Sequence, residues 1–381
     1  MGSKACSSEK KGERTKMEYM GELKKKWANR NPNMDLVRVV ATLSLISLHF
    51  FAYTNFYKET IEKGDTYIAC MIGARIFFME CVPLFVILSG YLMSKKELSL
   101  SYYKGIIYTV GIYVIISLIC IMYRIGINQQ KLTFTAGLKT ILNYSAAEYS
   151  WYIEMYFGLF ALIPFLNLIY HNLKTKKAKQ ALILTLLVLC TLPSLCNVYA
   201  NGTKIVPAWW TTLWPLLYYF IGCYIKEYPI KLSWIWNLVL LGAALIVCTA
   251  FSYTRSTGKL FEWGAYNEWG GWHNALISVL MFIFLSNLKL EKIPDLVKGL
   301  LFGISKLSLG IYLSSWILDD YVYKRLTAEL TNFREQSGRF GVTVIKIFFG
   351  ALLVSLVANV VYAILSKCVQ KIWAVCRRKK Q

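Results

Sequence analysis

Hydrophobic residues along the chain are gathered in ten long runs, which shorter polar segments separate. The runs cover approximately residues 34–53, 67–93, 105–123, 151–170, 180–197, 208–225, 232–251, 271–287, 299–320 and 342–366. Most of them have the length of about 20 residues that a helix needs to cross the hydrocarbon core of a bilayer. The pattern predicts an all-α fold, a polytopic transmembrane helical bundle of about ten spans.

Charged residues are few, and their sign depends on their position. Hydrophobic residues make up 56% of the 381 and charged residues 17%, below the level of about a quarter that is typical of soluble domains. Of the 43 Lys and Arg residues, 27 lie in segments on the side of the N-terminus and 12 in the opposite loops. This bias predicts that both termini are cytoplasmic. Anionic lipid headgroups are the expected partner of the net charge of +22, and nucleic acid is not needed to explain it.

The two ends of the chain differ from the apolar middle. Residues 1–30 are polar and rich in Lys, which predicts a cytoplasmic tail, and residues 371–381 form a second, basic tail. The transmembrane domain is therefore expected over residues 31–370. The ten cysteines include no CxxC pair and mostly lie within the runs, so neither a metal site nor a disulfide framework is predicted.

The first run carries ionisable residues that a purely structural span does not need. Arg38 and His49 are eleven residues apart, which is about three helical turns, so both lie on one face and about 16 Å apart along the axis. Thr42 lies on the same face and Asp35 lies close to it. Because such groups are costly in a membrane, the stripe favours a lined cavity within the bundle. The alternative is that Arg38 reaches the headgroups and His49 is a packing residue.

The second run contains Arg75 and Glu80 in its interior. Counted from the outer end, Glu80 lies at about the depth of His49, which favours a His49–Glu80 pair that orients the imidazole as a base. A pair between Arg75 and Glu80 within one helix is the alternative, although five residues is a poor spacing for it.

Polar and aromatic residues also mark the predicted outer side. Glu154 lies one turn inside the fourth run, and Asp319 ends a polar stripe in the ninth run that includes Ser315. Tryptophan is more frequent in the outer segments, where Trp263 and Trp269 are candidates for stacking on sugar rings. An aromatic belt at the membrane surface is the alternative explanation.

Several segments resemble the bacterial membrane-bound acyltransferase-3 family. Arg38 and His49 reproduce its Arg-x10-His signature, VPLFVILSGYL resembles the end of its second span, and SWYIEMYFGLFALIPFLN and SKLSLGIYL resemble its fourth and late spans. Two departures are Ser315, where the family often has a histidine, and a basic pair after the second span that is reduced to Lys104. The resemblance implies transfer of an acyl group, usually acetyl from cytoplasmic acetyl-CoA, to a cell-surface or lipid-linked glycan in the bacterial cytoplasmic membrane.

Together, these features suggest roles for the candidate residues. Arg38, with Lys104, is expected to bind the phosphates of the acyl-CoA donor. His49 is expected to act as general base toward an acceptor hydroxyl or to carry the acyl group briefly, with Glu80 orienting it. The acceptor is expected to contact the outer-side residues Glu154, Trp263, Trp269 and Asp319. A transporter or flippase without acyl transfer is the alternative, since polar stripes also line substrate pathways.

Overall fold

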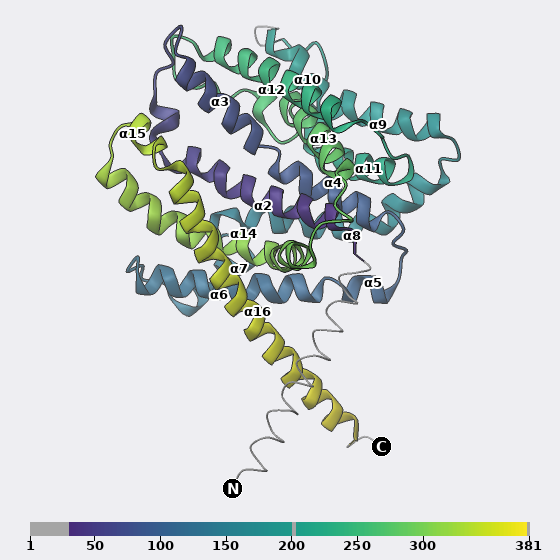
Figure 1. The fold of residues 1–381 in the computed structure, drawn as a ribbon. Coiled ribbons are helices and arrows are strands. Elements are labelled where there is room, and N and C mark those ends of the chain that lie inside the picture. Colours follow the sequence, from purple (N-terminus) through teal and green to yellow (C-terminus); the bar gives the residue numbers. More distant parts are fainter. Residues whose placement is uncertain (1–29, 200–202, 379–381) are drawn as a thin grey trace.

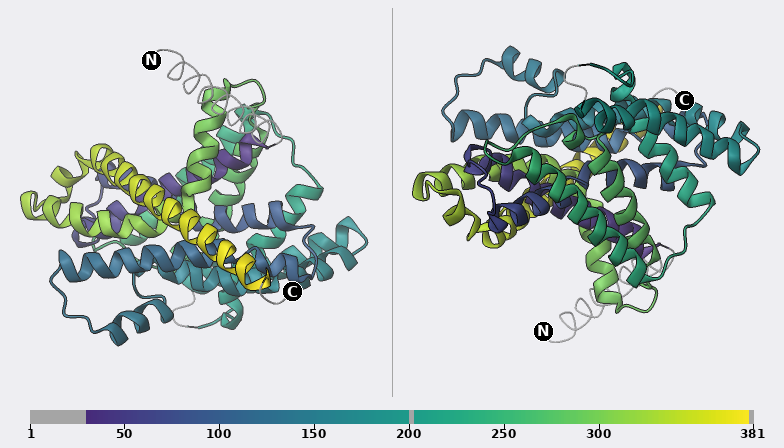
Figure 2. Two further views of the ribbon diagram at one scale, coloured as in Figure 1. Left: turned by 90° about the horizontal axis from the view of Figure 1, so that it is seen from below. Right: turned by 90° about the horizontal axis from the view of Figure 1, so that it is seen from above.

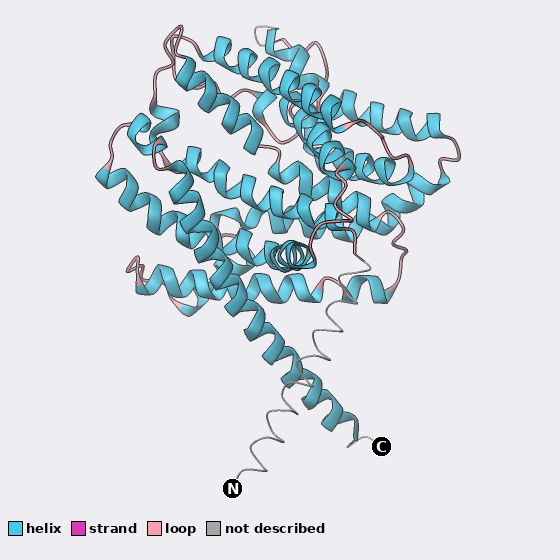
Figure 3. Cartoon of the chain, in the orientation of Figure 1, coloured by secondary structure: helices cyan, strands magenta, loops and turns pink. Residues whose placement is uncertain are grey.

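The computed structural model describes residues 30–199 and 203–378, and this part of the chain consists of helices joined by loops, with two isolated β-bridges and no longer strand (Figures 1 and 3). The predicted tails at 1–30 and 371–381 lie partly outside the described residues. The longer helices are α2 Pro32–Tyr53, α3 Thr66–Phe78, α4 Cys81–Met93, α6 Ile107–Gly126, α8 Trp151–Asn172, α9 Lys176–Cys190, α11 Trp214–Glu227, α12 Trp234–Ser256, α13 Trp272–Asn287, α14 Asp295–Glu329 and α16 Phe340–Arg378. Shorter helices are η1 Asn55–Lys58, α5 Leu100–Lys104, α7 Phe134–Leu142, η2 Glu148–Ser150, α10 Leu192–Cys196, η3 Asn197–Tyr199, η4 Trp209–Leu213, η5 Ala265–Asn267 and α15 Phe333–Ser337.

Helices occupy all ten predicted runs, which confirms the all-α polytopic bundle. Eight helical segments among the described residues are long and apolar enough to cross a membrane. The other two runs, 180–197 and 208–225, contain the shorter helices α9 and α11. A proline interrupts each of these two runs. Pro193 lies in the first turn of α10, directly after the end of α9, and Pro215 lies in the first turn of α11. The cytoplasmic position of both termini stays a prediction.

The second run is two helices instead of one. α3 ends at Phe78, α4 begins at Cys81, and Glu80 lies in the break between them. Pro83 lies in the first turn of α4, where its missing N–H costs no helical hydrogen bond. Met79 and Glu80 keep right-handed helical dihedrals in this break, and the N–H of Leu84 already bonds to the carbonyl of Glu80.

α2 lies at the centre of the bundle, in contact with α3, α4, α13, α14 and α16 (Figures 1 and 2). Asn31 caps its N-terminus by accepting a hydrogen bond from the backbone N–H of Asn33, and Pro32 occupies the first turn. The last part of α16 projects beyond the bundle in Figure 1. Its side chains between Leu353 and Ile372 include many exposed apolar residues, as expected for a lipid-facing helix.

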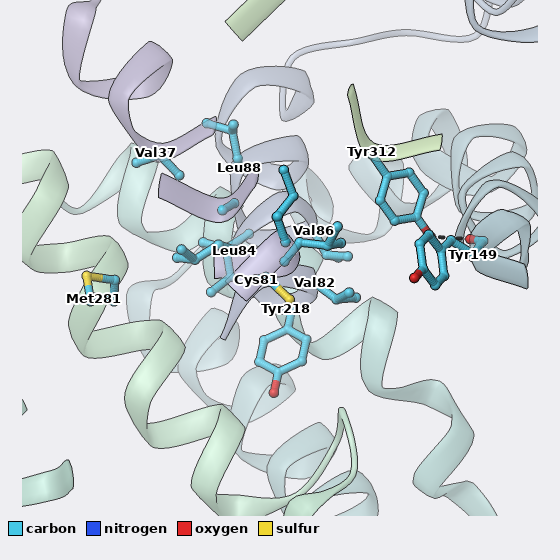
Figure 4. Close-up of a cluster of buried hydrophobic side chains, with 14 of the residues drawn as sticks. Val37, Cys81, Val82, Leu84, Val86, Leu88, Tyr149, Tyr218, Met281 and Tyr312 are labelled. Atoms are coloured by element: carbon cyan, nitrogen blue, oxygen red, sulfur yellow. Dashed lines mark hydrogen bonds between the residues drawn. The ribbon is translucent and has the colours of Figure 1, made fainter. Parts of the chain in front are cut away.

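Small residues allow α4 and α11 to touch along their backbones. A Cβ atom built on Gly90 would overlap the carbonyl oxygen of Tyr219, and one built on Gly222 would overlap that of Ile87. Cys223 also directs its thiol to the carbonyl of Gly90. This close contact fixes α4, whose buried apolar side chains line the centre of the bundle (Figure 4).

Candidate active site

His49 near the C-terminal end of α2 meets the carboxylate of Asp319 from α14. Nδ1 of His49 lies 2.8 Å from Oδ2 of Asp319, and the hydroxyl of Tyr149 donates to the same oxygen at 2.7 Å. Because an ionised carboxylate only accepts hydrogen bonds, Nδ1 is the donating nitrogen. Nε2 is then the nitrogen of the neutral ring that can accept a proton.

Aromatic contacts hold the imidazole ring in this orientation. The ring of Tyr149 stacks on it with centroids 3.9 Å apart. The hydroxyl of Tyr312 donates in turn to the backbone carbonyl of Tyr149, as Figure 4 shows. Asp319 is fully buried, while the His49 side chain keeps 12% of its surface exposed. The arrangement therefore has an oriented base with one accessible side.

The predicted pairing of His49 with Glu80 is wrong. Oε1 of Glu80 accepts a hydrogen bond of 2.7 Å from Ser44, which lies on α2 five residues before His49. Residues five apart on a helix lie about 7.5 Å apart along its axis, and their side chains point in clearly different directions, so a contact with Ser44 keeps Glu80 away from His49. The carboxylate that orients His49 belongs to Asp319. The sequence suggested Asp319 as a residue that contacts the acceptor, but in the structure its carboxylate binds Nδ1 of His49.

A cavity of about 250 Å³ opens in front of His49. We call it the His49 cavity, and its walls include Tyr57, Trp151, Trp263 and Trp269. Two of the four predicted acceptor contacts, Trp263 and Trp269, thus lie where the base is. Glu154 is exposed and is not among the residues that line this cavity, although it belongs to the same helix, α8, as Trp151.

A second cavity, of about 430 Å³, surrounds Arg38 near the other end of α2. We call it the Arg38 cavity. Three basic residues line it, Arg30, Arg38 and Lys306, together with hydroxyl groups of Ser89, Tyr108, Thr109, Tyr152, Tyr156 and Ser308. Lys104 on α5 is exposed and does not line it. The cavity combines positive charge with hydrogen-bond donors, which suits a phosphate-bearing ligand.

Asp35 fixes the guanidinium groups at the mouth of this cavity. Its carboxylate accepts two hydrogen bonds from Arg30, at 2.7 and 3.2 Å, and lies 3.7 Å from Arg38. The hydroxyl of Ser305 on α14 donates to Asp35 at 2.7 Å and accepts from Nη1 of Arg38 at 3.1 Å. Desolvation of Arg38 is therefore offset by a buried carboxylate, and its other N–H groups have no hydrogen-bond acceptor among the described residues, so they can bind a ligand.

The two cavities meet in the middle of the bundle. Leu45, Val82 and Tyr312 line both of them, so the Arg38 cavity and the His49 cavity share one apolar wall section. Arg38 and His49 thus lie on either side of Leu45 along α2, as their common face predicted. Ser315, at the position of the family's late histidine, is buried and donates to the carbonyl of Tyr312.

Some of the site was not predicted from the sequence. Asp319 was visible as the end of the polar stripe in the ninth run, but nothing in the sequence indicated that it contacts His49 or that Ser305 on the same helix contacts Asp35. Tyr149 carried no signal, because it lies in a short 3-10 turn, η2, outside every apolar run. Groups of three or more potential metal ligands are absent from the described residues.

Comparison with known proteins gives one match. A family model described as an acyltransferase domain matches residues 31–363, which includes every residue that lines the two cavities except Arg30. No curated protein and no solved structure matches the chain.

Proposed function

Because the chain belongs to the acyltransferase-3 family, and is therefore an acyltransferase with membrane-spanning helices, we propose that it is an O-acyltransferase. It moves an acyl group from cytoplasmic acyl-CoA to a hydroxyl group of a cell-surface or lipid-linked glycan, at the bacterial cytoplasmic membrane. The observation that carries this proposal is the pair of cavities that meet along α2, one lined with basic residues and the other with an oriented base.

The Arg38 cavity is the donor site in this proposal. Arg30, Arg38 and Lys306 bind phosphate groups of the coenzyme, and the planar guanidinium of Arg38 contacts two phosphate oxygens together. The thioester then extends toward Leu45, Val82 and Tyr312. These three side chains line both cavities, so the acyl group passes between them to the acceptor, and this group is acetyl in the proposal.

The His49 cavity is the acceptor site. A sugar ring lies against Trp263 or Trp269 and directs a hydroxyl group to Nε2 of His49, which takes its proton. The hydroxyl oxygen attacks the thioester carbon, the carbon–sulfur bond breaks, and His49 returns the proton to the sulfur of the leaving coenzyme. Asp319 stabilises the imidazolium that forms between these two proton transfers.

The test is turnover of radiolabelled acetyl-CoA by purified protein in lipid nanodiscs, with and without a glycan fraction from the cell envelope. His49→Ala should abolish thioester turnover and transfer. His171→Ala is the matched control, because His171 at the end of α8 bonds to the carbonyl of Ser94, away from both cavities. Substrate flux across the bilayer without acyl turnover would instead support the transporter or flippase.

A further inference from the structure

Arg75 is a buried cation that no described carboxylate neutralises. It lies in the last turn of α3, its exposed fraction is zero, and it takes part in no ion pair among the described residues. The Arg38 guanidinium, by contrast, lies beside Asp35. A buried charge without a partner is costly, so the surroundings of Arg75 need an explanation.

Neutral groups surround the Arg75 guanidinium. Nε donates to the hydroxyl of Tyr57 at 2.8 Å and Nη1 donates to Oδ1 of Asn267 at 3.2 Å. The guanidinium carbon lies 4.3 Å from the ring centroid of Trp263 and 4.7 Å from that of Phe261. Nη2 is buried and has no hydrogen-bond partner among the described residues. These contacts stabilise the cation without cancelling its charge.

The uncompensated charge lies directly behind the wall of the acceptor cavity. Tyr57 and Trp263, which contact Arg75, also line the His49 cavity. The residues that line this cavity include no carboxylate and, apart from His49, no basic side chain. The negative charge of Asp319 lies behind His49, on its own wall.

Neighbouring acidic residues on the outer side do not neutralise Arg75. Glu262 forms ion pairs with Arg255 and Lys259, and these two cations lower the pKa of its carboxyl group against the opposing effect of desolvation. The carboxylate of Glu268 accepts a hydrogen bond from the indole N–H of Trp263, and it is exposed to solvent, which screens its charge.

We infer that Arg75 makes the His49 cavity selective for acceptors that carry an anionic group, a carboxylate or a phosphate. Such an acceptor places its charge against the Tyr57–Trp263 wall and its hydroxyl group toward His49. This inference rests on the proposed function, because it names the class of acceptor for the same site. It deepens the earlier expectation that Trp263 only stacks on a sugar.

The size of the effect follows from the thickness of one indole ring. An anion that packs on the cavity side of Trp263 lies about 8 Å from the guanidinium carbon, and at an effective dielectric constant of about 20 this separation gives a preference of about 30-fold. The anion need not displace Trp263, because the attraction acts through the ring.

The first experiment measures the charge preference of the cavity without any acceptor. Ala52 lines the cavity and is exposed, so Ala52→Cys is made in a background without Cys70 and Cys368, the exposed cysteines among the described residues, and without Cys6 and Cys376. Its rates of reaction with an anionic and a cationic methanethiosulfonate of similar size are compared. Arg75→Gln should lower the anionic-to-cationic rate ratio by about 10-fold or more. Arg255→Gln, which removes a cation paired with Glu262, should leave the ratio within about twofold.

An unchanged ratio in Arg75→Gln would overturn the inference. If Arg75→Gln does not fold, the protein with Arg75 in place still tests the inference. Its anionic-to-cationic rate ratio at Ala52→Cys is compared with the ratio at Gln130→Cys, which lies in an exposed outer loop. A ratio at Ala52→Cys no higher than at Gln130→Cys would equally refute an electropositive cavity.

The second experiment tests acceptor choice directly. Methyl glucuronoside, its neutral methyl ester, and methyl glucoside 6-phosphate are offered with acetyl-CoA. The carboxylate or the phosphate acceptor should exceed the ester in kcat/KM by about 30-fold, and Arg75→Gln should remove this preference while it retains transfer to the ester. Equal loss toward all three acceptors would assign Arg75 to the chemical step and overturn the selectivity. Absence of any His49-dependent thioester turnover would refute the proposed function. The rate ratio of the two methanethiosulfonates would still measure the charge preference of the His49 cavity.

Discussion

Replacement of Asp319 by Asn tests the central geometry of the site. The side chains have nearly the same shape, so Asp319→Asn removes the negative charge beside His49 and leaves the packing of α14 in place. The amide can also present an N–H where His49 Nδ1 and Tyr149 both require an acceptor. We therefore expect the variant to remain folded and to lose acyl transfer.

The magnitude follows from the separation of the two groups. His49 Nδ1 and Asp319 Oδ2 are 2.8 Å apart, and Asp319 is fully buried. With charge centres about 4 Å apart and an effective dielectric constant of about 20, the carboxylate stabilises an imidazolium by about 4 kcal/mol. Because Asn keeps part of this interaction as a hydrogen bond, kcat should fall by about 10²- to 10³-fold.

The assay is acetyl transfer at saturating donor and acceptor, with size-exclusion chromatography to confirm that the variant is monodisperse. Asp320→Asn is the matched control, since Asp320 is the next residue and pairs with Lys324, Tyr123 and Asn128, away from His49. It should change kcat by less than about threefold. An equal loss in both variants, or full activity in Asp319→Asn, would refute the assignment of Asp319 as the residue that orients the base.

Three further predictions concern donor binding by Arg38, the role of Glu80, and the packing of α4 against α11. Arg38→Lys keeps the charge but loses the planar fork, so it should raise the apparent KM for acyl-CoA more than the KM for the acceptor, and unchanged donor saturation would contradict this role. Glu80→Gln keeps an acceptor for Ser44 and should alter kcat by less than about threefold, whereas a loss of about 10² would restore Glu80 as the partner of His49. Gly90→Ala should lower the thermal unfolding temperature because its Cβ overlaps the backbone of α11, while Gly303→Ala, with open space around it, should not.

The amino-acid sequence alone determined the class of fold and the first half of the site. A segment that crosses a bilayer must satisfy all its backbone hydrogen bonds internally, so a long apolar run becomes a helix whatever its neighbours are. Within one helix, spacing gives the face of each residue, which is why Arg38 and His49 were correctly placed along one line. The outer-side tryptophans Trp263 and Trp269 were found by composition, since aromatic residues concentrate in that segment.

The partners of these residues depended on how the helices are rotated and where they break. Depth along the membrane is one coordinate, and it matched His49 with Glu80, whereas the structure pairs His49 with Asp319. The rotation of α14 about its axis brings Asp319 to His49, and the packing of α2 against α4 brings Ser44 to Glu80. The sequence contains no local signal for either contact, because both are set by packing between helices.

For Arg75 too, the sequence showed where the residue lies in its run, and the tertiary structure decided its neighbours. Its place inside an apolar run was visible in the sequence, where a pair with Glu80 was the alternative interpretation. In the folded chain, Tyr57 of η1 and the loop residues Phe261 and Trp263 surround it, and they come from two segments about 200 residues apart. Only the packing of these two loops against α3 places an unpaired cation behind the wall of the His49 cavity, since contacts between distant segments are made by tertiary structure and not by local sequence preference.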